Sequence, residues 1–203
     1  MVKSSGFYPL THPQKAIWYT DKFYPGTGIS NIISTMRLRK DIDFTVLEQA
    51  INYVVKYNEG LRLRILEGGT GYRQYVAPYR YHRLKIVDFS TRGGWKAFLQ
   101  WLEEQARIPL ESIDSDLFEF VLGRIGEGDG VLFMKTHHTI TDAWSMILVG
   151  QQINDYYFKI KAGIEPDDPH YPSYLDYIEL ESQYEQSEEF KVSREFWNSK
   201  FAT

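Results

Sequence analysis

The sequence has no cysteine at any of its 203 positions. Disulfide bonds, thiolate metal sites and cysteine nucleophiles are therefore excluded. Because a chain without disulfides is typical of a reducing compartment, we expect a cytoplasmic protein.

Long apolar runs are also missing. The first ten residues lack the apolar core of a signal peptide, and the longest apolar stretch, around residues 144–149, is far too short to cross a bilayer. We expect neither a membrane span nor an export signal.

Neither sign of charge dominates, since 23 Lys and Arg residues stand against 27 Asp and Glu residues, a formal net charge of −4. Without a basic excess, nucleic acid is not an expected partner. The glycine runs at 68–71 and 126–130 lack the spacing and the lysine of a phosphate loop. We interpret both runs as hairpin turns.

The first half of the chain has the patterns of an ordered core, with 43% hydrophobic and 16% aromatic residues overall. Thr11 followed by Pro13 predicts the start of a short helix. Asp43 precedes apolar residues with the 3, 4 and 7 spacing of one helix face. Strands are expected at 32–39, 61–66, 72–76 and 84–89, the second and third as a hairpin.

The second half continues with a helix at 94–107, strands at 117–125 and 131–137, and a long helix from about 141 to 163. Interleaved strands and helices predict an α/β or α+β fold, a mixed sheet flanked by helices. We divide the chain into a lobe at 1–163 and a connector with a C-terminal helical extension at 164–203.

Two adjacent histidines end the strand at 131–137. Alternation places His137 and His138 on opposite faces, and the turn that follows leads into the long helix, which Thr141 or Asp142 can cap. An imidazole on such a turn can accept a proton or orient a nucleophile, although most histidines at strand ends are structural. Because adjacent strand residues diverge, we predict no metal site.

The segment His137–Ser145 resembles the His-His-x-x-x-Asp-Gly-x-Ser motif of condensation domains and of the wider chloramphenicol acetyltransferase-like superfamily. Residues 9–18, which include Gln14, resemble the opening motif of that family, and residues 58–62 resemble its Glu-x-Leu-Arg motif. The chain therefore resembles the amino-terminal lobe of a non-ribosomal peptide synthetase condensation domain. Residues 17–20 and 22–25 are most similar to the starter domains of lipopeptide synthetases.

The resemblance implies an acyltransferase that forms an amide bond when the amine of a carrier-bound aminoacyl group attacks an acyl thioester. It implies that His138 is the catalytic residue and His137 a structural one, that Asp142 forms a buried ion pair with Arg62, and that Ser145 belongs to the motif. Ala143 stands where the motif has glycine, so a methyl group lies where the backbone would face the carrier arm.

No cofactor is expected to bind this lobe, because the family's substrates travel on phosphopantetheine or coenzyme A. The implied partners are a carboxy-terminal lobe, a peptidyl or aminoacyl carrier protein, and an acyl-CoA or acyl carrier protein. Starter N-acylation with a fatty acyl group is the preferred subclass. Two alternatives stay open, namely an epimerization domain of the same superfamily and a non-catalytic lobe that docks carrier proteins.

Overall fold

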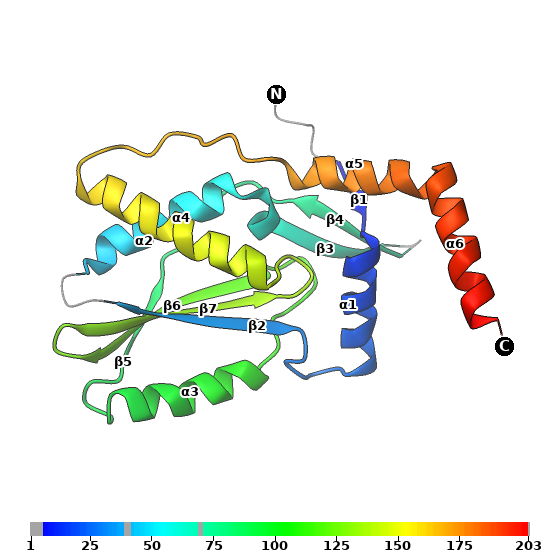
Figure 1. Cartoon of the computed structure of the whole chain (residues 1–203). Coiled ribbons are helices and arrows are strands. Elements are labelled where there is room, and N and C mark those ends of the chain that lie inside the picture. The colour runs from blue at the N-terminus through cyan, green and yellow to red at the C-terminus, as the bar shows by residue number, and fades with distance from the viewer. Residues whose placement is uncertain (1–5, 39–41, 69–70, 203) are drawn as a thin grey trace. The chain divides into compact units, whose positions relative to one another are not determined.

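The computed structural model describes residues 6–38, 42–68 and 71–202. These residues form two compact units, one that ends at Tyr171 and one that begins at Pro172. The residues that the sequence singles out for function all belong to the first unit, whose elements are labelled in Figure 1.

A four-stranded mixed sheet lies at the centre of the first unit. Its order is β2 (Asn31–Leu38), β7 (Asp129–His137), β6 (Phe118–Gly126) and β5 (Lys85–Asp88). The β5–β6 pair is parallel and the other pairs are antiparallel. The strands predicted near these positions are confirmed, although Arg39, the last residue of the first one, lies outside the described residues.

Helices cover both faces of this sheet (Figure 1). Leu132 and Met134 of β7 belong to the core that includes α2 (Phe44–Tyr57) and α4 (Ala143–Lys161). The alternate residues Val131 and Phe133 belong to a second core with α3 (Trp95–Arg107). Each fully buried Leu or Phe side chain contributes about 1.5–3 kcal/mol, so the alternation in β7 fixes the face on which His137 lies at the end of the strand.

Helix α2 begins as its sequence predicts. The Asp43 carboxylate accepts hydrogen bonds from the backbone N–H groups of Thr45 and Val46. These contacts satisfy two of the donors that the first turn leaves without a helical partner. The apolar face that follows is buried, with Leu47, Ala50, Ile51, Val54 and Val55 at 2% exposure or less.

A smaller antiparallel sheet has the order β1 (Tyr8–Pro9), β4 (Gly71–Val76) and β3 (Leu63–Gly68), and the 3₁₀ helix η1 (Glu59–Arg62) leads directly into β3. The predicted hairpin of β3 and β4 is confirmed, and Gly69 and Thr70 of its turn lie outside the described residues. Helix α1 (His12–Phe23) starts in a capping box between Thr11 and Gln14.

The second unit contains α5 (Tyr174–Glu185) and α6 (Glu188–Phe201). The helical spacing predicted there is thus divided at Ser187, whose Oγ accepts the Phe190 N–H and caps α6. Within the described ranges, each helix is too short or too polar to cross a bilayer.

Candidate functional site

The candidate site is the turn of residues 138–142, between the end of β7 and the start of α4. The turn is held from the strand side, because the Ile140 N–H donates to the His137 carbonyl over 3.0 Å. Thr141 is buried, and its hydroxyl group forms a hydrogen bond with the Thr136 hydroxyl group of β7. The two histidines at the start of the turn have very different surroundings.

His138 is exposed, and its ring is oriented by its own turn. Its Nδ1 atom lies 2.9 Å from the Thr141 carbonyl oxygen. Because a carbonyl oxygen can only accept, Nδ1 carries the hydrogen and the neutral ring keeps a lone pair on Nε2. The backbone is fixed as well, since the His138 N–H donates to the Ser30 carbonyl over 2.8 Å. The ring therefore presents a proton acceptor at a solvent-facing turn.

His137 is only 4% exposed and has partners at both ring nitrogens. Its Nε2 atom lies 2.8 Å from Asp21 Oδ2, and its Nδ1 atom accepts the Thr139 backbone N–H over 3.2 Å. Burial lowers the pKa of His137 by more than the Asp21 carboxylate raises it. The ring is therefore neutral at pH 7, with its hydrogen on Nε2.

Asp142 is the N-cap of α4. Its Oδ1 atom accepts from the Ser145 backbone N–H over 2.7 Å and from the Ser145 hydroxyl group over 2.6 Å. These hydrogen bonds lower the pKa of the Asp142 carboxyl group. The prediction that Thr141 or Asp142 caps this helix is confirmed, with Asp142 in that position.

The expected buried ion pair between Asp142 and Arg62 is wrong. Asp142 is exposed, and its carboxylate bonds Ser145. Arg62 lies on η1, where burial lowers the pKa of its guanidinium group and the charge of Glu59 opposes that effect. The physical reason is local competition, since the first-turn N–H groups of α4 lie next to the carboxylate.

Ala143, the residue in the glycine position of the motif, is the first residue of α4 and is exposed. Trp144 and Ile147 follow on the same helix and are 67% and 52% exposed. An apolar surface therefore adjoins the turn that carries His138.

Gln14 holds the turn from the other side. Its Nε2 group donates to the Thr139 carbonyl over 3.1 Å and to Gln74 Oε1 over 2.8 Å, and Gln74 donates back to Gln14 Oε1 over 2.7 Å. Both amides are at most 2% exposed, where an unpaired polar group would be costly. The sequence singled out Gln14 only as part of a motif, and Gln74 was missed.

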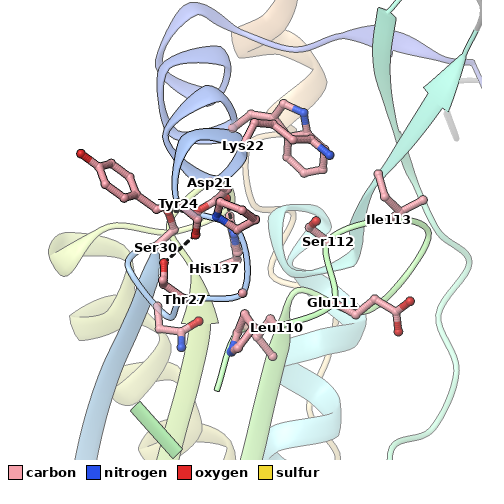
Figure 2. Close-up of a pocket in the computed structure, with 15 residues that line it drawn as sticks. Asp21, Lys22, Tyr24, Thr27, Ser30, Leu110, Glu111, Ser112, Ile113 and His137 are labelled. Atoms are coloured by element: carbon pink, nitrogen blue, oxygen red, sulfur yellow. Dashed lines mark hydrogen bonds and ion pairs between the residues drawn. The ribbon is translucent and has the colours of Figure 1, made fainter. Parts of the chain in front are cut away.

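Asp21 was also missed, although it contacts His137 at the edge of a cavity of about 320 Å³. Figure 2 shows the Asp21 carboxylate between the Ser30 hydroxyl group and the His137 ring. Asp21 lies in the last turn of α1, where the helix dipole disfavours an acidic side chain. An acidic residue at the end of a predicted helix was the one sequence feature that could have indicated a special role for Asp21.

The histidine element does not assemble a set of converging metal ligands. Within the described residues, His137 lies against the Asp21 carboxylate and is hydrogen-bonded to Thr139, and Asp142 is hydrogen-bonded to Ser145. Of the two adjacent histidines, only His138 is exposed, and a structural metal site usually needs four protein ligands.

The sheet, its flanking helices and the histidine turn agree with a family assignment. The condensation domain family model matches residues 4–203 of the chain. The chain therefore belongs to the condensation domain family, and the resemblance inferred from the motifs is confirmed. One of the plipastatin synthase proteins of Bacillus subtilis (strain 168) is 40% identical over 196 residues, which cover 96% of this chain and 8% of the relative. Surfactin synthase subunit 1 of the same organism is 37% identical over 199 residues, which cover 96% of this chain and 6% of the relative.

Solved condensation domains share the fold. The starter condensation domain of rhizomide synthetase RzmA aligns with a TM-score of 0.87 at 22% identity, covering 97% of this chain and 48% of that one. A double mutant of the RzmA domain in complex with C8-CoA and Leu-SNAC aligns with a TM-score of 0.88 at 21% identity, covering 97% and 46%. The predicted fold class is confirmed, and the chain spans about half the length of these solved domains.

Proposed function

We propose that this chain is one half of an amide-forming condensation domain and that His138 is its catalytic residue. The observation that carries the proposal is the ring geometry of His138, whose Nδ1 is bonded to Thr141 and whose Nε2 keeps its lone pair at an exposed turn. Of the two adjacent histidines, it is the one with a free proton acceptor.

The reaction is attack of a carrier-bound aminoacyl amine on an acyl thioester. The amine nitrogen forms a C–N bond to the thioester carbonyl carbon, and the C–S bond breaks. His138 Nε2 accepts the proton that the amine loses, and the leaving thiolate takes up a proton. The products are an amide and a thiol, so no oxidant or metal is required.

The preferred reaction is starter N-acylation by a fatty acyl group. Support comes from the 40% identity to a plipastatin synthase protein and from the likeness to the RzmA starter domain with C8-CoA and Leu-SNAC. The exposed apolar surface of Trp144 and Ile147 beside the turn suits contact with an acyl chain or with the other half of the domain. Coenzyme A or phosphopantetheine would carry the substrates.

The other motif residues have supporting roles in this proposal. His137 stabilises the turn through its contact with Asp21 and its hydrogen bond from the Thr139 N–H. The hydrogen bonds between Asp142 and Ser145 stabilise the start of α4. Ala143 adds one methyl group to the exposed first turn of α4, next to the turn that carries His138. None of these side chains needs to contact the reacting atoms.

The proposal is tested with this chain joined to the rest of a condensation domain and supplied with a medium-chain acyl-CoA and an aminoacyl carrier protein. We expect an N-acyl aminoacyl product detected by mass spectrometry. Exchange of the aminoacyl α-proton without amide formation would instead indicate an epimerization domain. Carrier-protein binding with neither reaction would indicate a docking lobe.

A further inference from the structure

Asp21 connects the two residues that hold the backbone on either side of the turn. One carboxylate oxygen, Oδ1, accepts the Ser30 hydroxyl group, and the other, Oδ2, lies 2.8 Å from His137 Nε2 (Figure 2). Ser30 in turn accepts the His138 N–H at its carbonyl oxygen over 2.8 Å. Asp21 therefore reaches His138 by two separate routes.

The route through His137 depends on a tautomer. With its hydrogen on Nε2, the His137 ring places that hydrogen beside the Asp21 carboxylate, whose Oδ2 atom lies 2.8 Å from Nε2, and leaves Nδ1 free to accept the Thr139 N–H over 3.2 Å. With its hydrogen on Nδ1, the ring could still donate to the Thr139 hydroxyl group, but it would no longer accept the Thr139 N–H, and the lone pair of Nε2 would face the Asp21 carboxylate over 2.8 Å. An acceptor at position 21 selects the tautomer that keeps the turn closed.

The position of Asp21 is unfavourable for helix α1 itself. The residue lies in the last turn of α1, where the carbonyl end of the helix dipole repels a negative charge. Its side chain is also largely buried, at 21% exposure. A residue placed against its local preference is best explained by its contacts with His137 and Ser30.

We propose that Asp21 is a positioning residue for His138, acting through the His137 tautomer and through Ser30. The expected effect on catalysis rests on the proposed function. The expected effect on the histidine tautomers does not, because it depends only on contacts within this chain. The class of group required at position 21 is a hydrogen-bond acceptor, so Asn should replace Asp where Ala cannot.

The first test is nitrogen-15 NMR of the histidine rings in the 203-residue chain. The parent is expected to show His137 with its hydrogen on Nε2 and His138 with its hydrogen on Nδ1. Asp21→Ala should lose the single tautomer at His137 and should lower the Nδ1-protonated fraction at His138, whereas Asp21→Asn should keep both patterns. An unchanged His138 pattern in Asp21→Ala would overturn the proposal, whatever reaction the domain performs.

Glu111→Ala is the matched control, because Glu111 is an exposed carboxylate that lines the same cavity. None of the described contacts of His137 involves Glu111. Its removal should leave both histidine patterns as in the parent. If Glu111→Ala changed the His138 pattern as much as Asp21→Ala, the effect would come from the charge of the cavity and the positioning role would be refuted.

The second test is steady-state amide formation by the full condensation domain over a range of substrate concentrations. Asp21→Ala should lower kcat by roughly tenfold with KM within about twofold, and Asp21→Asn should recover most of the loss. Loss of rate in His138→Ala but a full rate in Asp21→Ala would refute the positioning role alone. A full rate in His138→Ala would refute the proposed function.

If Asp21→Ala does not fold, Ser30→Ala decides the question, because it removes one contact of Asp21 and leaves the contact with His137. It should lower the Nδ1-protonated fraction of His138 and reduce kcat by less than Asp21→Ala is expected to do. A parent-like His138 pattern and rate would overturn the proposal.

Discussion

The His138 ring is oriented by the Thr141 carbonyl oxygen, which lies 2.9 Å from Nδ1, three residues further along the chain. Thr141 is itself fixed by a hydrogen bond between its hydroxyl group and that of Thr136. The orientation of the proton acceptor thus depends on a short buried turn more than on a distant charged partner. The turn therefore orients the His138 ring, whereas the Asp142 cap that follows it stabilises the start of α4.

Asp142→Ala is expected to remove a helix cap and nothing larger. Loss of the hydrogen bonds to Ser145 should lower the free energy of unfolding by about 1 kcal/mol, and Asp142→Asn or Asp142→Ser should retain most of it. Urea unfolding of the three variants measures the difference. A loss of several kcal/mol would instead support a buried ion pair of Asp142.

The ion pair between the buried Lys135 and the more exposed Glu119 should respond differently to changes at its two ends. The Lys135 side chain is 3% exposed, the Glu119 side chain is 36% exposed, and Nζ lies 3.2 Å from Oε2. Glu119→Ala leaves a buried ammonium group without its carboxylate and should lower the free energy of unfolding by about 2–4 kcal/mol. Lys135→Met should cost about 1 kcal/mol or less. Denaturant unfolding that ranks the two variants in the reverse order would contradict this account of the pair.

Gly28→Ala should destabilise the loop before β2. A Cβ atom at this position would overlap the Ala106 carbonyl oxygen, a backbone atom that cannot rotate away. We expect the free energy of unfolding, measured in urea, to fall by about 1–3 kcal/mol. Gly150→Ala is the control, since a Cβ atom there meets nothing within 4 Å and the site is inside α4. The control should gain about 1 kcal/mol from helix propensity.

The buried histidines should weaken the fold in mild acid. Burial lowers the pKa of His137 and of His82, in each case against the charge of a nearby aspartate. Because the unfolded chain binds these protons first, the stabilisation is complete above about pH 6.5 and is lost as the pH falls through the lowered pKa values. The expected slope is at most about 1.4 kcal/mol per pH unit for each proton. NMR titration tests this residue by residue, and a His137 pKa at or above the ordinary value of about 6.5 would contradict it.

Periodicity and capping predicted the elements that form the scaffold of the site. The alternation of residues 131–137 predicted the strand β7 that ends at His137, and the Asp43 cap with its spaced apolar residues located α2. Strand alternation and helix capping depend on residues only a few positions apart, so both can be predicted from a single sequence. The strand, the turn and the long helix that frame His138 were predicted for the same reason.

The partners of the turn were not predicted, because they depend on tertiary packing. Asp21 and His137 are far apart in the sequence, and Gln74 meets Gln14 only after β4 pairs with β1. The mistaken Asp142–Arg62 pair arose from the motif resemblance, which does not show that Ser145 N–H is the nearer donor. Local caps and long-range contacts compete for the same carboxylate, and the three-dimensional packing around it decides between them.

The most direct measurement of the central claim is single-turnover amide formation by His138→Ala in the complete condensation domain. We expect product formation to fall by roughly 10²- to 10⁴-fold while the melting temperature stays close to that of the parent, because His138 is exposed and contributes little to packing. His170→Ala, which changes a side chain that is 89% exposed, is the control and should keep the parental rate. A His138→Ala domain that folds and forms amide at the parental rate would contradict the account.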